Sequence, residues 1–179
     1  CFPDAEAAKE AESYLDQKIA ECDSVGGVVE CVISGLPVGL GEPVFEKLDA
    51  NLAKAILSIG AVKGFEIGDG FVATKACGSE NNDEFRMDGD KIVKETNHAG
   101  GVLGGISDGS DVIFRAAFKP TPSIAKSQET VTKDGENIDL VIHGRHDPVV
   151  VPRAVVVVES MAAITAMDML LMSMTSRLD

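Results

Sequence analysis

The chain has 179 residues, of which 45% are hydrophobic, and this length is typical of a single domain spanning residues 1–179. Such a chain can bury a sizeable core, which excludes a disordered or fibrous protein. Its 16 basic and 29 acidic residues give a net charge of −13, which argues against binding to nucleic acid or to an anionic membrane surface. The absence of tryptophan and the single tyrosine argue against base stacking as well.

The ends of the chain and its cysteines indicate where the protein works. The four cysteines, at positions 1, 22, 31 and 77, lack the spacing of a zinc site, so we expect reduced thiols and no metal. The first residues lack the basic and apolar regions of a signal peptide, and there is no initiator methionine. We therefore expect a cytoplasmic protein and a piece of a longer chain. The most apolar stretch, Val149 to Met174, is interrupted by three charged residues, which argues against a membrane span.

The first third of the chain predicts the order helix, strand, helix, strand. Asp4 is a suitable N-cap for a helix over residues 4–23. A run of β-branched residues from Val28 to Ile33 predicts a buried strand, and another strand is expected around Ala61–Ile67. The expected inner face of the first helix holds Ala8, Ala11, Leu15, Ile19 and Cys22. The expected inner face of the second helix holds Phe45, Leu48, Leu52, Ile56 and Ile59.

The remainder of the chain predicts a hairpin, two strands and a long helix. Residues 78–96 are polar and contain an Asp-Gly turn, so we expect a mobile hairpin there. Strands are expected over Val112–Phe118 and near Ile138–Ile142, and the last 25 residues predict a helix. One stripe of that helix holds Met161, Ile164, Met167, Leu171 and Met174. This stripe indicates packing in a core or at a subunit interface, with a metal or cofactor role as the alternative.

One basic segment stands out in this acidic chain. From Val112 to Gln128 there is no acidic residue, only three basic ones, which are Arg115, Lys119 and Lys126. The segment either is reserved for an anion or is a chance gap at a sheet edge. Lys119-Pro120-Thr121-Pro122-Ser123 ends it, and two prolines stiffen a turn that offers ammonium and hydroxyl donors. These donors suit a phosphate, although a surface turn would have the same composition.

Two further clusters are candidates for a site. Asn97 to Gly105 contains two glycine pairs, which allow the backbone to approach a flat ring or a phosphate, although a tight turn with one histidine is the alternative. Arg145-His146-Asp147-Pro148 lies between apolar runs, which is typical of a strand end facing a site or of a structural ion pair. An aspartate beside an arginine stays ionised and can accept a proton.

These motifs, in this order, resemble the chorismate synthase family. The strongest likeness is Arg145-His146-Asp147-Pro148-Val149, then Ala154, then Val156 to Met161. The segments Asn97–Ser107, Lys119–Ser123, Ser34–Glu42 and Ala61–Phe71 resemble the same family. The likeness covers nearly the whole chain and is weakest in residues 1–24.

The resemblance implies a lyase of the shikimate pathway, which serves aromatic amino acid biosynthesis. Members convert 5-enolpyruvylshikimate 3-phosphate to chorismate and phosphate by an anti-1,4 elimination. The resemblance implies reduced FMN as the cofactor, no metal, and a homotetramer for the full-length enzyme. It also implies an α+β fold, in which an antiparallel sheet packs on long helices as one half of a β-α-β sandwich.

The resemblance also assigns roles to residues. Asp147 would act near N5 of the flavin as a proton acceptor. The residues expected to contact flavin are Gly60, Ala61, Gly104, Lys119, Pro120, Thr121, Pro122, Ser123 and Arg145. The family has asparagine where this chain has Gly60, so only a backbone contact is expected at that position.

The family's N-terminal motifs are absent. These motifs, a Gly-Ser-His segment and a Ser-x-Arg segment, belong to a half that brings two acid histidines and the substrate-binding arginines. The three histidines of this chain, His98, His143 and His146, stand outside such motifs. We therefore expect the C-terminal half of the enzyme, inactive alone. The alternative is an isolated flavin-binding or oligomerisation module without catalysis. A flavin reductase that uses NAD(P)H would predict a dinucleotide fingerprint, which the sequence lacks.

Overall fold

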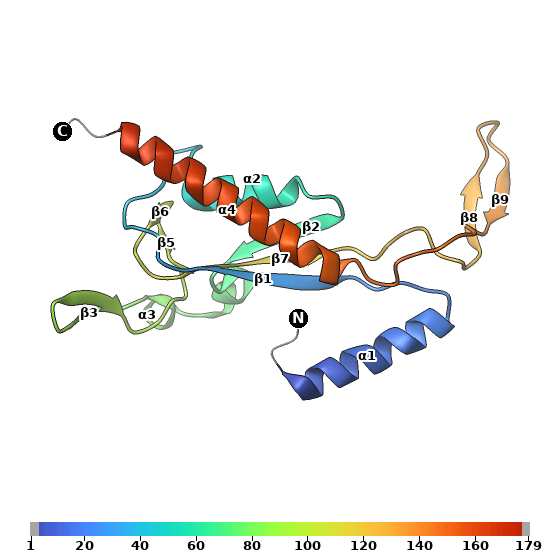
Figure 1. The fold of residues 1–179 in the computed structure, drawn as a ribbon, viewed down its shortest axis with the longest axis horizontal. Coiled ribbons are helices and arrows are strands. Elements are labelled where there is room, and N and C mark those ends of the chain that lie inside the picture. Colours follow the sequence, from blue (N-terminus) through green and yellow to red (C-terminus); the bar gives the residue numbers. More distant parts are fainter. Residues whose placement is uncertain (1–3, 177–179) are drawn as a thin grey trace.

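A three-stranded antiparallel sheet covered on one face by two helices forms the centre of the protein (Figure 1). The structure is a computed structural model that describes residues 4–176. The strands follow the order β1 (Gly27–Ile33), β7 (Val112–Phe118), β2 (Val62–Ile67). The covering helices are α2 (Leu48–Leu57) and α4 (Val151–Thr175). The predicted α+β architecture, an antiparallel sheet packed on helices, is thereby confirmed.

The other elements lie around this unit. Helix α1 (Ala5–Ala20) is capped as predicted, because the Asp4 carboxylate accepts hydrogen bonds from two backbone N–H groups of the first turn. The two hairpins β3–β4 and β8–β9 project from opposite ends of the molecule (Figure 1). The remaining elements are η1 (Gly70–Lys75), α3 (Gly78–Asn81), β3 (Phe85–Asp88), β4 (Lys91–Lys94), β5 (Val102–Leu103), β6 (Ile106–Ser107), β8 (Gln128–Val131) and β9 (Asn137–Leu140).

Strand β7 builds the core with every second side chain. Because side chains alternate along a strand, one set of four points toward the helices and all four are buried. These four are Val112, Phe114, Ala116 and Phe118. Helix α2 packs onto them with Leu48, Leu52 and Ile56, which are fully buried. Helix α4 contributes Ala154, Val158, Ala162 and Met169. The core is thus a single layer between sheet and helices.

Several side chains expected inside are exposed. Phe45 is 85% exposed and lies before α2, which begins only at Leu48. The preceding residue, Val44, has φ 63°, outside the right-handed helical region. Strand β1 buries only Val29, since its other face is not covered by the helices. Helix α1 has no buried residue, so its expected inner face is not packed within the described chain. The sequence periodicity identified these elements correctly but placed more of their surface inside than one half of a sandwich can bury.

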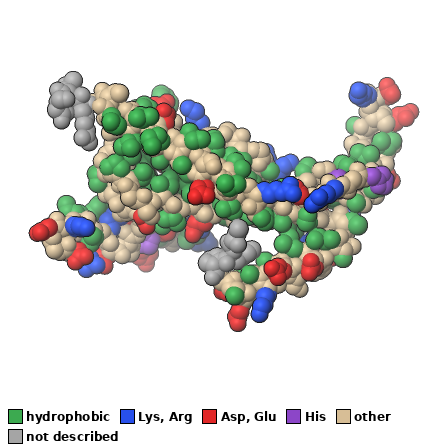
Figure 2. Space-filling view, in the orientation of Figure 1, with side chains coloured by type: hydrophobic (Ala, Val, Ile, Leu, Met, Phe, Trp, Pro, Cys, Tyr) green, Lys and Arg blue, Asp and Glu red, His purple; other side chains and the backbone are tan. Residues whose placement is uncertain are grey.

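Helix α4 turns its methionine-rich stripe away from the sheet. Ile164, Met167, Leu171 and Met174 are between 54% and 67% exposed. The face on the sheet is instead rich in small residues, which let the helix approach β1 closely. Figure 2 shows hydrophobic side chains gathered over α4. Met161, the first member of the predicted stripe, is partly buried and packs against the core, whereas the other four lie outside it. For these four, packing against another surface remains the interpretation.

Within the described residues, α4 is also the one helix long and apolar enough to cross a membrane. It carries Arg153, Glu159 and Asp168, and its opposite face packs on the sheet. A core helix of a soluble protein has the same length and hydropathy. A helix packed between two layers needs an apolar face toward each of them, and α4 is apolar on two sides.

The polar excursions fold as hairpins. Residues 85–94 pair as β3 and β4, as predicted, and the mobility of that segment stays a prediction. The strand expected near Ile138–Ile142 is β9, which begins and ends earlier and pairs with the unpredicted β8. Neither strand of the β8–β9 hairpin buries a side chain. The sequence of these strands therefore lacks a clear alternation of apolar and polar residues.

A pair of substitutions tests which face of the helices forms the core. Leu52→Ala should lower the free energy of unfolding by about 2–5 kcal/mol, because it leaves a cavity at a fully buried site. Ile164→Ala, on the exposed stripe, should change it by no more than about 0.5 kcal/mol. Urea unfolding followed by circular dichroism measures both. A comparable loss in the two variants would mean that the stripe is packed within this chain.

Candidate functional site

A cavity of about 410 Å³, with both apolar and charged side chains in its lining, lies where β1 begins and β7 ends. The end of α1 lines one side, and the segments 124–125 and 145–148 line the other. Its charged or titratable side chains are Cys22, Asp23, Arg145, His146 and Asp147. The cavity therefore contains two residues that the sequence singled out, Arg145 and Asp147.

Hydrogen bonds bring two further predicted segments, Gly60-Ala61 and Lys119–Ser123, to the same end of the sheet as this cavity. The N–H of Lys119 donates to the carbonyl of Ala61 at 2.9 Å, so Gly60-Ala61 lies beside the start of the proline-rich turn. The hydroxyl of Ser24, a lining residue, donates to the carbonyl of Thr121 at 2.7 Å. Gly26 permits this approach, because a Cβ there would lie 2.3 Å from the carbonyl oxygen of Phe118. Gly60, Ala61 and the segment from Lys119 to Ser123 thus gather at one end of the sheet.

Gly104 does not join them. It forms the turn between β5 and β6 with Gly105, and both have positive φ, as a two-residue hairpin turn requires. That turn lies near the Val112 end of β7, and a strand of seven residues is about 20 Å long. Within one chain, Gly104 is therefore at the opposite end of the sheet from Lys119.

Asp147 is paired with a different arginine from the one that the sequence suggested. Its Oδ2 accepts a hydrogen bond from Nη1 of Arg153 at 2.6 Å, in the first turn of α4. Arg145, two residues away in sequence, makes no hydrogen bond or ion pair with any residue of the range 4–176. The alternative of a structural ion pair between Asp147 and Arg145 is therefore not formed, and the Arg145 guanidinium has no partner among the described residues.

The acid-free segment is only partly available to an anion. The Arg115 guanidinium contacts Glu66 of β2 at 3.3 Å and donates to the carbonyl of Gly68. Lys126 binds Asp23 at 2.6 Å, and this hydrogen bond keeps the pKa of Asp23 below its usual range. Lys119 alone of the three remains exposed with no ion pair to another described residue. Of the three basic residues of the segment, Lys119 is therefore the one left available to an anion among the described residues.

The residues present fit a phosphate-bearing planar cofactor. The hydroxyl oxygen Oγ1 of Thr121 is buried and has no hydrogen-bond partner among residues 4–176, and a buried hydroxyl without a partner is costly. Lys119 and Ser123, in the same turn, and Arg145, which lines the cavity, supply further donors. At Gly60 a Cβ would meet no atom within 4 Å, so the backbone is open on that side. The set holds donors for an electron-rich or anionic ligand.

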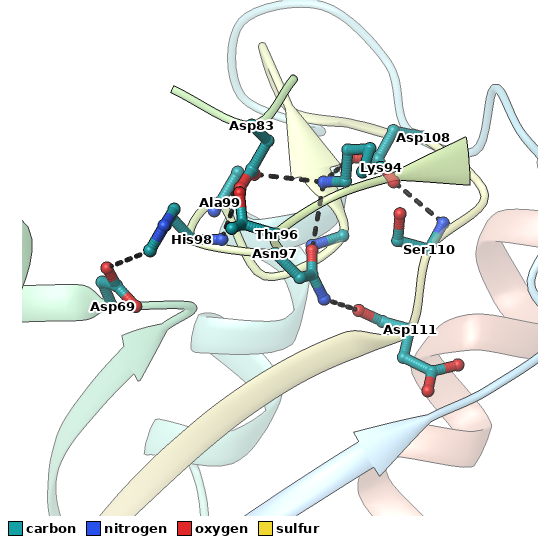
Figure 3. A network of polar contacts seen from close by, with 11 residues as sticks. Asp69, Asp83, Lys94, Thr96, Asn97, His98, Ala99, Asp108, Ser110 and Asp111 are labelled. Atoms are coloured by element: carbon teal, nitrogen blue, oxygen red, sulfur yellow. Dashed lines mark hydrogen bonds and ion pairs between the residues drawn. The ribbon is translucent and has the colours of Figure 1, made fainter. Parts of the chain in front are cut away.

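A second polar cluster, which the sequence did not predict, lies at the other end of β7 (Figure 3). The Lys94 ammonium is 3% exposed and binds the carboxylates of Asp83 at 3.2 Å and Asp108 at 2.7 Å. Asp83 also accepts from the backbone N–H groups of His98 and Ala99. The cluster fixes the base of the β3–β4 hairpin and the turn that follows it.

The same cluster holds His98 against Asp69. Nδ1 of His98 lies 2.7 Å from Oδ2 of Asp69, and the Asp69 N–H donates to the His98 carbonyl at 2.8 Å. Burial alone would raise the pKa of Asp83, but its hydrogen bonds from Ala99, Thr96, His98 and Lys94 together hold that pKa well below its usual range. Asp108 behaves likewise, because burial is opposed by Lys94 and Ser110.

Metal and disulfide chemistry have no support in the described part of the chain. No group of three or more histidine, cysteine or acidic side chains within residues 4–176 is arranged to hold a metal ion. Cys22, Cys31 and Cys77 are free thiols, and Cys1 lies outside the described residues. The larger hollow of about 760 Å³ is an apolar groove between α2 and α4, lined partly by the exposed stripe, and is not near the predicted site residues.

These observations define the class of the protein: an α+β chain with one open helical face and a donor-rich cavity at the end of its sheet. The family model described as chorismate synthase matches residues 1–171. The chain belongs to the chorismate synthase family.

Relatives and a solved structure agree with this assignment. The chain is 66% identical over 180 residues to the chorismate synthase of Lachnoclostridium phytofermentans, covering 100% of this chain and 49% of that protein. It is 67% identical over 178 residues to that of Agathobacter rectalis, covering 99% and 48%. A crystal structure of chorismate synthase matches with TM-score 0.79 and 33% identity, over 96% of this chain and 45% of that one. The chain thus spans about half the length of the curated relatives it matches.

The buried cluster predicts a particular acid sensitivity. Asp83 and Asp108 have lower pKa values when folded than when unfolded, so the unfolded chain binds more protons as the pH falls. The stability that they contribute is present above about pH 5 and is lost progressively below it. Asp83→Asn should therefore flatten the fall in unfolding free energy between about pH 5 and pH 2. Urea unfolding across this range measures the slope, and an unchanged slope would contradict the assignment.

Replacing Lys94, the cation of this buried cluster, tests the same ion pairs at neutral pH. Lys94→Met leaves two buried carboxylates without their partner and should cost about 3–5 kcal/mol at pH 7. Lys91→Met, in the same strand but exposed, is the matched control and should stay within about 0.5 kcal/mol. Equal effects would mean that Lys94 is not buried in its ion pairs.

Proposed function

We propose that the chain is the flavin-binding half of a chorismate synthase. The complete enzyme would convert 5-enolpyruvylshikimate 3-phosphate to chorismate and phosphate by a carbon–oxygen elimination in the shikimate pathway. The observation that carries the proposal is the cavity in which the Arg145 guanidinium is free and Asp147 is held, in a chain that belongs to this family. As a step of aromatic amino acid biosynthesis, the reaction would take place in the cytoplasm.

Each residue proposed for the site, in the cavity or in the neighbouring turn, has a role that suits its chemistry. Reduced FMN, when bound, would supply electron density to the substrate as the phosphate leaves. Lys119, Arg145 and the hydroxyls of Thr121 and Ser123 would bind the flavin and its phosphate through charge-assisted hydrogen bonds. Pro120 and Pro122 would hold that turn in shape, and Gly60 and Ala61 would offer backbone contacts. Asp147 would accept a proton at its carboxylate.

Gly104 lies far from the other residues that are proposed to bind flavin. Since it lies at the far end of β7, a flavin held by Lys119 and Arg145 of one chain would not contact Gly104 of that same chain. We keep Gly104 as a proposed flavin contact only in the assembled enzyme, where another copy could bring it to the cavity. A homotetramer supplies such copies.

The other half of the polypeptide would complete the enzyme. The substrate carries a phosphate and two carboxylates, and half of the 16 basic residues of this chain are already ion-paired or assigned to the flavin. The exposed stripe of α4 and its groove would pack against that half, because the relatives are about twice as long as this chain. The chain alone is therefore expected to form no chorismate, even with reduced FMN.

Replacing the proposed proton acceptor tests the function. Asp147→Asn in the full-length enzyme keeps the shape but removes the basic carboxylate, so turnover should fall by about 10²–10⁴-fold. Flavin and substrate should bind nearly as before. The measurement is chorismate formation with dithionite-reduced FMN, alongside binding titrations. Wild-type turnover in a folded variant would reduce Asp147 to a structural residue. A wild-type protein that binds flavin but forms no chorismate would favour the binding module.

Removing the free guanidinium tests the flavin site. Arg145→Ala should weaken FMN binding by about 10–100-fold, because a charge-assisted hydrogen bond contributes about 1.5–3 kcal/mol. Fluorescence titration of FMN with the full-length protein measures the dissociation constant. Lys54→Ala, which removes a cation beside the apolar groove, is the control for a nonspecific charge effect. An unchanged titration for Arg145→Ala would remove this residue from the site.

A further inference from the structure

We propose that Arg153 is the positioning residue of Asp147: it holds one carboxylate oxygen so that the other faces the ligand, and it leaves Arg145 free for the flavin. The inference rests on the proposed function, because it concerns the same site. It adds a residue that neither the sequence motifs nor the family likeness singled out. The observation behind it is the 2.6 Å contact between Arg153 Nη1 and Asp147 Oδ2.

The contact uses only one oxygen of the carboxylate. Oδ2 carries the hydrogen bond from Arg153, while Oδ1 has no partner among residues 4–176. Asp147 lines the cavity whereas Arg153 is not among its lining residues. We infer that Arg153 holds Oδ2 and leaves Oδ1 available to a ligand in the cavity. A carboxylate held at one oxygen can still accept a proton at the other.

The backbone fixes the two residues relative to each other. Asp147 precedes Pro148, which restricts its backbone to extended conformations. Arg153 follows Pro152 in the first turn of α4, where proline favours the helical φ. The carbonyl of Pro148 accepts a hydrogen bond from the N–H of Val25 at 2.8 Å, which ties the segment to the chain just before β1. The pair therefore spans a short, rigid connection between the sheet and a long helix, as a preorganised site requires.

The ion pairs around the cavity leave one of its basic side chains without an acidic partner in the described chain. Its two carboxylates each have a cation from outside the lining: Lys126 for Asp23 and Arg153 for Asp147. His146 directs Nε2 to the carbonyl of Ile142 at 3.1 Å rather than to Asp147. Arg145 is then the cavity cation with no acidic partner in the described chain.

Because the Arg153 side chain is exposed, it can be replaced to test its role at Asp147 without unfolding the protein. The Arg153 side chain is 71% exposed, and an ion pair at such exposure contributes little to folding. The Arg86–Glu95 pair of the β3–β4 hairpin, at 2.7 Å and similarly exposed, provides a matched control far from the cavity. Arg153→Gln and Arg86→Gln should therefore both leave the unfolding midpoint unchanged.

The experiment compares four variants of the full-length enzyme, Arg153→Gln, Arg153→Lys, Asp147→Asn and the double variant Asp147→Asn/Arg153→Gln. We expect Arg153→Gln to lower kcat at least tenfold with KM within about twofold, and Arg153→Lys to recover most of the loss, since an ammonium can also hold Oδ2. Adding Arg153→Gln to Asp147→Asn should lower kcat no further. FMN titration of the enzyme without substrate should give Arg153→Gln a dissociation constant within about threefold of wild type.

Three outcomes would overturn the proposal. They are wild-type kcat in Arg153→Gln, an equal loss of kcat in the Asp147→Asn background, or a loss of FMN affinity as large as that of Arg145→Ala. The first would mean that the ion pair has no role, the second that Arg153 acts independently of Asp147, and the third that Arg153 itself binds flavin. A wild-type rate in Asp147→Asn is a different failure, because it removes the proposed proton acceptor and not its positioning.

Discussion

The structure depends on the pairing of β7 with both β1 and β2. Its seven residues run antiparallel to β1 over their whole length, from Gly27 opposite Phe118 to Ile33 opposite Val112. Its other edge pairs with β2, with a register shift near Val62. Because β7 is the central strand, its inward side chains form the floor of the core and its two ends fix the position of every polar cluster. The sheet therefore sets both the stability and the site.

Charged side chains at the two ends of β7 differ in their burial and in their pairing. At the Val112 end, Lys94 and two aspartates are buried and mutually satisfied, so their charges serve to order a turn and a hairpin. At the Phe118 end, the ion pairs are exposed and one guanidinium is left without an acidic partner in the described chain. A satisfied cluster has little to offer a ligand, whereas an unsatisfied one can bind it. This contrast is why the site is placed at the Phe118 end.

Local patterns predicted the elements but not their surroundings. The alternation in Val112–Phe118 and the helical spacing of Leu48, Leu52 and Ile56 identified β7 and α2, because each pattern lies on one buried face. Helix α4 is apolar on several sides, so its periodicity could not say which stripe meets the sheet. Arg145 is nearer to Asp147 in sequence, whereas the turn into α4 brings Arg153 nearer in space, so the actual ion pair could not be predicted. The Lys94 cluster joins the hairpin at 78–96, the segment that follows it and Asp108, and no local pattern predicts that their side chains meet.

The β8–β9 hairpin has a consequence for how this protein can vary. The chain leaves the cavity wall at Ala125 and returns to it near Arg145, and the hairpin between them projects away from the sheet (Figure 1). Closing a longer loop is cheap, since a doubling in length costs only about 0.6 kcal/mol. The excursion can therefore lengthen, shorten or change its composition while both cavity segments stay anchored. It is a region where natural sequences can diverge, and where a label or tag can be inserted, without disturbing the chemistry beside it.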